Sequence, residues 1–373
     1  MATQAFHADR IFDGDQWHET AAVLVQAGRV QAIVPQADAP AGQQVAGWLT
    51  PGLIDLQVNG GGGVLFNNAA DSAGIETICR AHAGFGTTSV MVTLITDCPE
   101  VTAQAIGAVQ SARVQGLLGL HLEGPHLAQS RKGTHDPALI RPMQDQDLAQ
   151  LLTTALRPLI VTVAPESVSL DQTRALAAAG ITVSLGHSDC SAETALCYAK
   201  AGASMVTHLF NAMSQITPRA PGLAGAALDD GRLSAGVIAD GFHLNPSVLR
   251  LALRAKTGSA PLFLVSDAMA TVGSDLTSFA LNGRQIFRVK GRLTLADGTL
   301  AGADIALLDA VRYLHQVMDL PLAQALQMAT IAPAAALGLH DRGHLRVGAR
   351  ADFISLSPQI RCTGTWIDGR RVA

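Results

Sequence analysis

The sequence predicts an α/β protein in which a (β/α)8 barrel carries a small β domain built from both chain ends. Eight apolar, β-rich runs alternate with helical patterns, which is typical of parallel β/α units. Short strand-like segments with tight turns lie before and after this alternation. Several of the eight runs are followed by a Glu, His or Asp, and in a parallel barrel all these strand ends meet at one rim. A doubly wound sheet is the alternative architecture.

The two chain ends are predicted to form one β domain. An Asp-Gly pair between alternating apolar residues, such as Asp368-Gly369, is a strong hairpin signal. Neither end alone has enough apolar surface for a stable sheet, so residues 1–50 and 344–373 are expected to pack together as a small β-sandwich. Its predicted strands are Ala22–Gln26, Val30–Val34, Phe353–Leu356, Gly364–Ile367 and Arg370–Val372.

The barrel is predicted to span residues 51–343. Its expected strands are Leu53–Val58, Thr88–Ile95, Gly116–Leu122, Leu159–Ala164, Ile181–Leu185, Ser204–Thr207, Ser234–Ala239 and Leu262–Ser266. The helical patterns between them include Ile75–Ala83, Thr102–Ala112, Thr173–Ala179, Ala192–Ala201 and Ser247–Ala255. Asn282-Gly283 and Asp297-Gly298 break the alternation and predict β-hairpins inserted near residues 279–300.

The composition excludes several classes of function. Of the 373 residues 48% are apolar and only 15% are charged, against a usual charged share of about 25%. The net charge of −4 gives no electrostatic footprint for nucleic acid or an anionic membrane. The five cysteines contain no C-x-x-C pair, and the first twenty residues lack the apolar core of a secretion signal. We therefore expect a cytoplasmic protein that binds neither nucleic acid nor membrane.

Three residues at predicted strand ends form a candidate metal site. Glu123, His187 and His208 follow the third, fifth and sixth strands, and two imidazoles with one carboxylate suit a catalytic divalent ion such as Zn²⁺. Fe²⁺, Co²⁺ and Mn²⁺ accept the same ligands, so the metal stays open. Asp267 closes the eighth strand, where a carboxylate can take a proton from an attacking water and deliver it to a leaving group.

Several motifs, in family order, resemble those of the N-acetylglucosamine-6-phosphate deacetylases, a family of the amidohydrolase superfamily. They cover the chain from about residue 51 to 302. The matching segments are PGLIDLQVNG from Pro51, HLEGPHL from His121, KGTH from Lys132, GHS from Gly186, THLFNAM from Thr207, PGLAGAAL from Pro221, ADGFH from Ala239 and VSDAM from Val265.

This resemblance implies a hydrolase that removes acetate from N-acetyl-D-glucosamine 6-phosphate in amino-sugar catabolism or recycling. Asp267 would activate the water and protonate the departing amine, while His135 would help polarise the acetyl carbonyl. Arg219 resembles the family arginine that reaches the phosphate across a homodimer interface, a role that suits the guanidinium fork. The residues implied at the substrate are Thr134, His135, Asn211, Ala212, His243, Leu300, Ala301 and Gly302.

The first strand departs from the wider superfamily. Many amidohydrolases end this strand with His-x-His, whereas this chain has Gln57-Val58-Asn59. Neutral amides are poor ligands for a transition metal, so we predict one tightly held divalent ion per chain.

Three other functions remain open. The same chemistry could act on N-acetylgalactosamine 6-phosphate, because the sequence does not place the side chains that read the 4-hydroxyl. A non-catalytic binding protein with this fold would have lost its metal, which the complete set of Glu123, His187, His208 and Asp267 argues against. Deamination or lactam hydrolysis is the third, and the phosphate-binding roles that the resemblance implies for Arg219 and His243 disfavour it.

Overall fold

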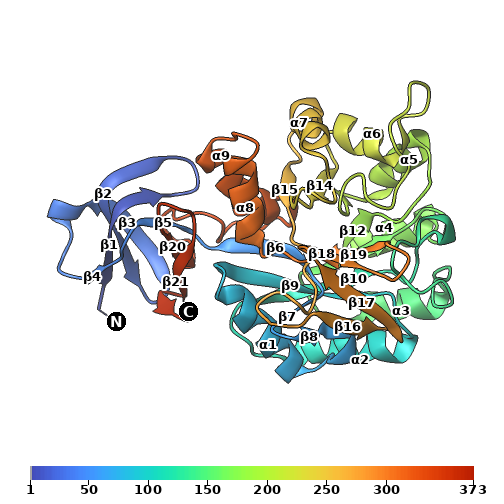
Figure 1. The fold of residues 1–373 in the computed structure, drawn as a ribbon, viewed down its shortest axis with the longest axis horizontal. Coiled ribbons are helices and arrows are strands. Elements are labelled where there is room, and N and C mark those ends of the chain that lie inside the picture. Colours follow the sequence, from blue (N-terminus) through green and yellow to red (C-terminus); the bar gives the residue numbers. More distant parts are fainter. Residues whose placement is uncertain (1) are drawn as a thin grey trace.

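The computed structural model describes residues 2–373 and contains the predicted parallel barrel. An eight-stranded parallel sheet runs in the spatial order β6-β9-β10-β11-β12-β13-β14-β15, so each strand pairs with the next barrel strand along the chain (Figure 1). The strands are β6 (Leu53–Val58), β9 (Thr87–Ile95), β10 (Leu117–Glu123), β11 (Leu159–Val163), β12 (Thr182–Leu185), β13 (Met205–Val206), β14 (Ser234–Val237) and β15 (Leu262–Leu264). The barrel is confirmed, and β11, β13, β14 and β15 end one or two residues earlier than predicted.

The barrel closes between β6 and the chain that follows β15. Near the carboxyl ends, the N–H of Asp267 donates to the carbonyl of Gln57 at 3.0 Å, and Val58 forms a parallel bridge with Ala268. At the other end, the carbonyl of Ala329 accepts from the N–H of Ile54 at 2.9 Å. Segments that follow the eighth strand therefore satisfy backbone groups that a direct β6–β15 ladder would otherwise use.

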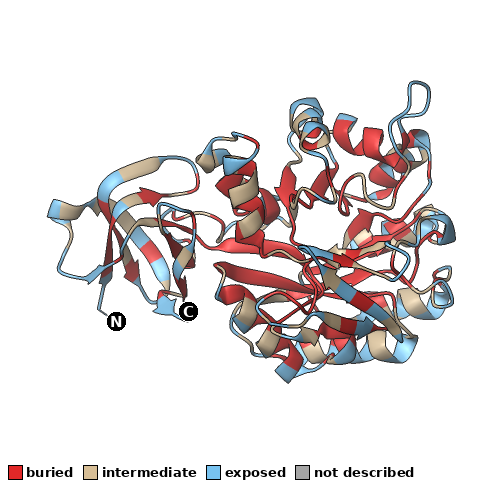
Figure 2. Cartoon of the chain, viewed as in Figure 1, coloured by how far each residue is buried: buried red, intermediate tan, exposed pale blue. Residues whose placement is uncertain are grey.

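Helices surround the barrel, and their polar caps explain where several of them begin. Asp71, Ser169, Ser191 and Asn245 each accept a backbone N–H at a helix start. The helices capped by Asp71, Ser169 and Asn245 begin before the predicted stretches, and the helix capped by Ser191 begins at the predicted Ala192. The helices are α1 (Ser72–Ala83), α2 (Pro99–Ser111), α3 (Asp145–Thr153), α4 (Leu170–Ala178), α5 (Ala192–Ala201), α6 (Gly222–Asp229), α7 (Pro246–Ala255), α8 (Leu307–Gln316), α9 (Leu322–Gln327) and α10 (Ile331–Ala336). The barrel strands between them are buried almost throughout (Figure 2).

Both chain ends contribute to a second eight-stranded sheet, which forms a separate domain (Figure 1). Its strands are β1 (Gln4–Phe12), β2 (Trp17–Gln26), β3 (Arg29–Pro35), β4 (Gln43–Gln44), β5 (Trp48–Pro51), β20 (Phe353–Leu356), β21 (Cys362–Ile367) and β22 (Arg370–Arg371). The ring centroids of Phe6 and Trp366 lie 6.2 Å apart although β1 and β21 are three strands apart in the order β21-β20-β5-β1. Neighbouring strands are spaced by about 4.8 Å, so the sheet curls around its own apolar core.

A third, antiparallel sheet of four strands follows the eighth barrel strand. It consists of β16 (Ser278–Leu281), β17 (Arg284–Val289), β18 (Arg292–Thr294) and β19 (Leu300–Ala303). The smaller elements are β7 (Gly60–Gly61), β8 (Val64–Leu65) and the 3-10 turns η1 (Gln36–Asp38), η2 (Phe66–Asn68) and η3 (Gln129–Arg131). Within residues 2–373, every helix is too short or too polar to traverse a lipid bilayer.

Candidate active site

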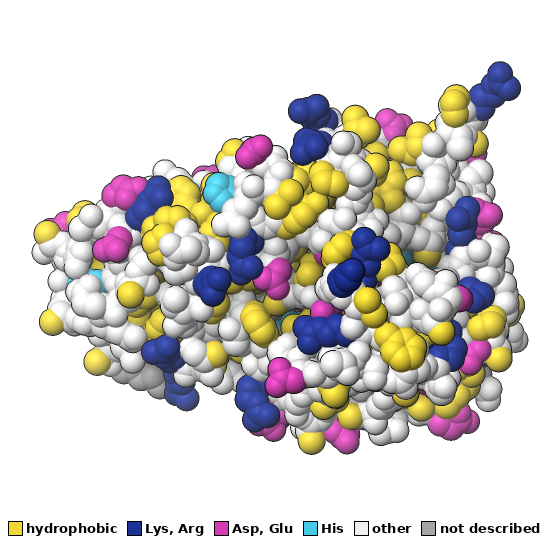
Figure 3. Space-filling view, in the orientation of Figure 1, with side chains coloured by type: hydrophobic (Ala, Val, Ile, Leu, Met, Phe, Trp, Pro, Cys, Tyr) yellow, Lys and Arg dark blue, Asp and Glu magenta, His cyan; other side chains and the backbone are white. Residues whose placement is uncertain are grey.

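A cavity of about 230 Å³ lies at the carboxyl ends of the barrel strands and gathers most of the predicted site residues. Figure 3 shows a hollow in the middle of one face, with His and acidic side chains visible inside it and basic side chains beside it. The lining residues are Asn59, Ile95, Glu123, Gly133, Thr134, His135, His187, His208, Asn211, Ala212, Ile238, His243, Asp267, Met269, Thr299, Leu300 and Gly302.

Four non-glycine residues of this lining share an unusual backbone, and one of them, Ala212, has a φ of 50°. His187, His208 and Asp267 have φ values of 47°, 29° and 51°, in the left-handed region that non-glycine residues rarely adopt. His187, His208 and Asp267 lie two or three residues after the end of a barrel strand, where the chain has left the ladder. Such strain typically costs about 1–3 kcal/mol per residue and persists where the surroundings enforce it.

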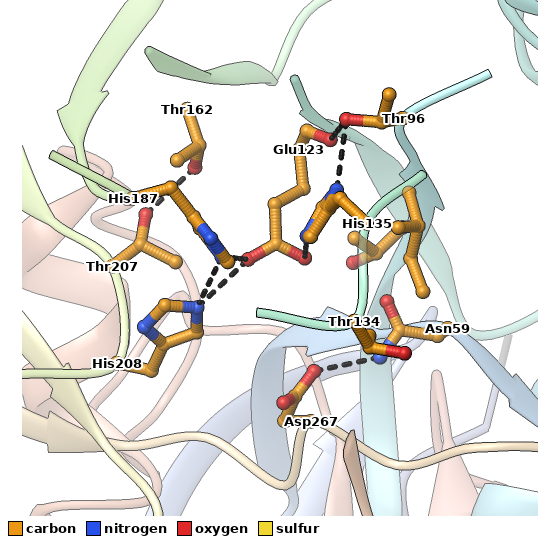
Figure 4. Close-up of polar contacts among 12 residues, drawn as sticks. Asn59, Thr96, Glu123, Thr134, His135, Thr162, His187, Thr207, His208 and Asp267 are labelled. Atoms are coloured by element: carbon orange, nitrogen blue, oxygen red, sulfur yellow. Dashed lines mark hydrogen bonds and ion pairs between the residues drawn. The ribbon is translucent and has the colours of Figure 1, made fainter. Parts of the chain in front are cut away.

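Glu123, His187 and His208 converge on one point. Oε1 of Glu123, the last residue of β10, lies 2.9 Å from Nε2 of His208 and 3.3 Å from Nε2 of His187. The two Nε2 atoms are 3.0 Å apart, and all three side chains are at least 94% buried. Figure 4 shows the carboxylate of Glu123 pointing at both rings. The structure therefore brings together the predicted trio from three separate strands.

The chemistry of this trio fits a divalent cation. Nδ1 of His187 donates to the carbonyl of Arg131 at 2.8 Å, because a carbonyl can only accept. The neutral ring of His187 then presents the lone pair of Nε2 to the carboxylate oxygen of Glu123 and to His208. Lone pairs that face one another in a dry site repel each other unless a proton or a metal cation lies among them. Two imidazole nitrogens and a carboxylate oxygen are ligands that Zn²⁺ and similar ions bind.

His135 provides a second histidine beside the same carboxylate. Its Nε2 lies 3.8 Å from Oε2 of Glu123, so Glu123, His135 and His187 also form a geometrically possible ligand group. We favour His208 as the ligand because its Nε2 lies within 3.0 Å of both other donor atoms, whereas His135 faces the opposite carboxylate oxygen. His135 is then left facing the cavity.

The proton position on His135 depends on Thr96. The hydroxyl of Thr96 has one proton and two acceptors in reach, Nδ1 of His135 at 2.8 Å and the carbonyl of Glu123 at 3.2 Å. When Thr96 donates to Nδ1, the neutral ring carries its own proton on Nε2, toward the cavity. Burial and the neighbouring His187 lower the pKa of His135 well below its usual value, so the neutral ring is the relevant form.

Burial has opposite outcomes at the two carboxylates. Burial alone would raise the pKa of Glu123, but its contacts with His187 and His208 outweigh this effect and hold that pKa well below the usual value. Burial raises the pKa of Asp267 to about 6, and the negative charge of Glu123 adds to the effect. Glu123 is thus ionised, whereas Asp267 has a pKa suited to exchanging protons near neutral pH.

The amides of Gln57 and Asn59 hold Asp267. Nδ2 of Asn59 donates to Oδ1 of Asp267 at 2.7 Å, and Nε2 of Gln57 donates to the same oxygen at 3.1 Å. From the sequence, these two amides were interpreted only as poor metal ligands. Their contact with Asp267 was not predicted, because it joins residues more than two hundred positions apart.

The predicted substrate residues separate into two groups. Thr134, His135, Asn211, Ala212, His243, Leu300 and Gly302 line the cavity, and Ala301 does not. His243 is oriented by Asp240, whose Oδ2 lies 2.7 Å from Nδ1 of the ring, so Nδ1 carries a proton. Ile95, Ile238, Met269 and Thr299 also line the cavity, but their residue types carry no functional signal in the sequence.

Arg219 lies away from the cavity on the exposed segment between β13 and α6. Residues 215–221 are all exposed, and Arg219 forms no ion pair with any residue in the range 2–373. Figure 1 shows this segment as a loop that projects from the molecule, and Figure 3 shows a basic side chain at its tip. Arg219 is therefore free to contact another molecule, but it does not reach the cavity of its own chain.

The fold and this strand-end site are those of an amidohydrolase, and comparison with known proteins gives the same result. A model of the amidohydrolase family matches residues 48–372, and the chain belongs to that family. It is 40% identical to an N-acetylgalactosamine-6-phosphate deacetylase of Shewanella sp. (strain ANA-3), covering 89% of this chain and 85% of the relative. It is 33% identical to an N-acetylglucosamine-6-phosphate deacetylase of Haemophilus influenzae, covering 94% of each chain.

A solved structure extends this comparison to the fold. A mutant N-acetyl-D-glucosamine-6-phosphate deacetylase from Mycobacterium smegmatis, in complex with N-acetyl-D-glucosamine-6-phosphate, superposes with a TM-score of 0.93. The two chains are 30% identical, and the match covers 100% of each. The deacetylase resemblance inferred from the motifs is confirmed.

Proposed function

We propose that this enzyme hydrolyses N-acetyl-D-glucosamine 6-phosphate to D-glucosamine 6-phosphate and acetate. The observation that carries the proposal is the single cavity in which Glu123, His187 and His208 converge opposite Asp267 and His135. This arrangement supplies a cation site, a proton carrier and a hydrogen-bond donor within one buried space. The family membership and the activities named for the relatives support amide hydrolysis of an amino-sugar phosphate.

Each residue has one task in the reaction. Asp267 accepts a proton from water, the water oxygen bonds to the acetyl carbon, and the carbonyl oxygen gains negative charge. His135, with its proton on Nε2, donates a hydrogen bond to that oxygen. Asp267 then delivers its proton to the nitrogen as the C–N bond breaks, which releases acetate and the amine. A divalent ion held by Glu123, His187 and His208 would supply Lewis-acid chemistry.

We propose Zn²⁺ as the resident ion, at one ion per chain. Two nitrogen ligands and one oxygen ligand match catalytic zinc sites. The amides of Gln57 and Asn59 donate to carboxylates, and neutral amides are poor ligands for a second transition-metal ion. Metal analysis of the purified protein tests this. Two tight equivalents per chain would contradict the single-ion proposal.

We further propose a homodimer in which Arg219 reaches the phosphate in the neighbouring active site. The support is the exposed, unpaired position of Arg219 on a projecting loop, within the part of the chain that the structure describes. Thr134, Asn211, Ala212, His243, Leu300 and Gly302 would contact the sugar phosphate from their own chain. A phosphate dianion does not cross a bilayer unaided, which supports a cytoplasmic location for the enzyme.

N-acetyl-D-galactosamine 6-phosphate is the second candidate substrate. The 40% identity to the N-acetylgalactosamine-6-phosphate deacetylase of Shewanella supports this second candidate. An acetate-release assay of both sugars, with and without the 6-phosphate and with Zn²⁺ supplied, tests the proposal. Faster release from the gluco sugar phosphate supports the first choice, and faster release from the galacto sugar phosphate selects the second. Acetate release from neither would contradict the proposed function.

A further inference from the structure

We propose that Gln57 and Asn59 are positioning residues that hold Asp267 for proton transfer and tie it to the metal-binding carboxylate of Glu123. This inference rests on the proposed function, because it assigns to Asp267 the task of moving the proton. The two amides lie at the end of β6, where many amidohydrolases carry a pair of histidines. Here they orient a carboxylate by hydrogen bonds.

The hydrogen bonds commit one oxygen of Asp267 and leave the other free. Oδ1 accepts from Nδ2 of Asn59 at 2.7 Å and from Nε2 of Gln57 at 3.1 Å. Oδ2 has no hydrogen bond from any residue in the range 2–373, and Asp267 borders the cavity. Figure 4 shows one oxygen of Asp267 directed at Asn59 and the other directed away from it. Oδ2 is therefore the oxygen that can take up and release the proton, and the two hydrogen bonds to Oδ1 fix the orientation of the carboxylate.

The amide of Gln57 also links the two carboxylates. Its Nε2 lies 3.1 Å from Oε1 of Glu123 and 3.1 Å from Oδ1 of Asp267, and an NH₂ group has one hydrogen for each. Placing a donor between two like charges in a buried site offsets part of their repulsion. Glu123 thus keeps its orientation toward His187 and His208 through the same side chain that restrains Asp267.

The orientation of both amides follows from the acceptors. An ionised carboxylate has only acceptor atoms, so the contacts at 2.7 and 3.1 Å must involve the nitrogen of each amide. Oδ1 of Asn59 is buried and has no partner among residues 2–373, while Asn59 lines the cavity. The backbone reinforces the restraint, because the N–H of Asp267 donates to the carbonyl of Gln57 at 3.0 Å.

The test separates positioning from folding and from metal binding. Asn59→Leu keeps the size of the side chain and removes the donor to Asp267. We expect kcat with the phosphorylated sugar to fall about 10–10²-fold, the range of a misplaced proton carrier. KM and the dissociation constant for Zn²⁺, measured by competition with a chromophoric chelator, should stay within about threefold. Gln57→Met should lower kcat similarly and also weaken Zn²⁺ binding at least about tenfold, since its amide contacts Glu123.

A double-mutant cycle shows whether Asn59 acts through Asp267, because a purely structural role would predict independent effects on the rate. If Asn59 acts through Asp267, adding Asn59→Leu to Asp267→Asn should lower the residual rate by less than twofold. Asn67→Leu is the matched control, because Asn67 is buried and bonds to Ile95 and Asp97 but lies outside the cavity lining. It should lower the melting temperature and leave kcat within about threefold. Asn59→Ala replaces Asn59→Leu in every arm if the leucine does not fold.

The outcomes distinguish this inference from the proposed function. Wild-type kcat in Asn59→Leu, or a full multiplicative loss in the double variant, would overturn the positioning role while acetate release by the wild-type enzyme still stands. Loss of Zn²⁺ from Asn59→Leu would also overturn it, since the residue would then serve the metal site. Absence of acetate release by the wild-type enzyme would instead remove the proposed function itself.

Discussion

Nε2 of His187 lies 3.0 Å from Nε2 of His208, and both rings face the same oxygen of Glu123. The two histidines follow β12 and β13, which pair in parallel through Leu185 and Val206, so each ring leaves its strand at the same height of the barrel. The register of the ladder therefore sets the distance between two donor atoms that lie 21 residues apart in the chain.

The choice between His208 and His135 as metal ligand can be tested directly. His208→Asn is expected to weaken Zn²⁺ binding by at least about 10²-fold, because it removes a nitrogen within 3.0 Å of both other donors. His135→Asn should retain one ion per chain and lower kcat instead. Metal content after dialysis against a weak chelator, read by atomic emission, checks both. The reverse pattern would assign the ligand role to His135.

Asp267→Asn should leave Zn²⁺ content and substrate binding nearly unchanged and lower turnover by at least about 10²-fold. An amide has the shape of the carboxylate but cannot carry the proton from water to the amine. Acetate release gives the rate, and binding of the intact substrate to the inactive variant can be followed by calorimetry. Turnover close to that of the wild type would rule out Asp267 as the proton carrier.

Thr96→Val tests the proton position on His135. The substitution removes the hydroxyl 2.8 Å from Nδ1, so a neutral ring whose Nδ1 accepts from Thr96 would no longer be held with its proton on Nε2. We expect kcat to fall about tenfold with little change in metal content. Thr96→Ser retains the hydroxyl and serves as the control, with activity near the wild-type level. Equal activity of the Val and Ser variants would show that Thr96 does not set the tautomer.

Stability should depend on pH through Asp55, which lies on β6 inside the barrel. Burial raises the pKa of Asp55 to about 7, and Oδ2 of this carboxylate has no partner among residues 2–373. The folded chain thus holds the proton between about pH 4 and 7 where the unfolded chain has lost it, so this contribution to stability falls as pH rises through that window. Above the folded pKa, the free-energy cost of burying the ionised carboxylate is fully present.

Asp55→Asn removes the titrating group, so the stability of the variant relative to the wild type should increase as pH rises. Relative to the wild type, its free energy of unfolding should gain about 3 kcal/mol between pH 5 and pH 8. Urea unfolding of both proteins at the two pH values measures this difference. Parallel pH dependence in the two proteins would mean that Asp55 does not carry the effect.

Mixing two impaired variants tests the proposed exchange of Arg219 between subunits. Asp267→Asn and Arg219→Ala chains should each be weakly active alone. In a mixed dimer, the chain with intact Asp267 receives Arg219 from its partner, so one site of the two should work. Co-refolded mixtures should then recover up to about a quarter of wild-type activity. No recovery would place Arg219 outside the neighbouring active site.

Local sequence patterns predicted much of this fold. Each of the eight apolar runs that predicted barrel strands overlaps one of β6 and β9 to β15, because a strand buried on both faces must be apolar along its length. The predicted helical stretches did not include α3, α6, α8, α9 or α10. Gly222 and Gly225 give α6 little helical propensity, and its burial in the packed barrel wall decides its conformation.

The sequence by itself determined the barrel strands, the chelating residues at their ends and the family. These signals are local, since each depends on residue type and on spacing within one strand and the turn after it. Only the tertiary structure decided that Gln57 and Asn59 hold Asp267, that Thr96 faces His135, and that Arg219 lies outside the cavity. The first of these relationships depends on how the barrel closes between β6 and the chain after β15, which joins residues more than two hundred positions apart that no local pattern connects. The other two depend on how separate loops are placed at the rim of the barrel.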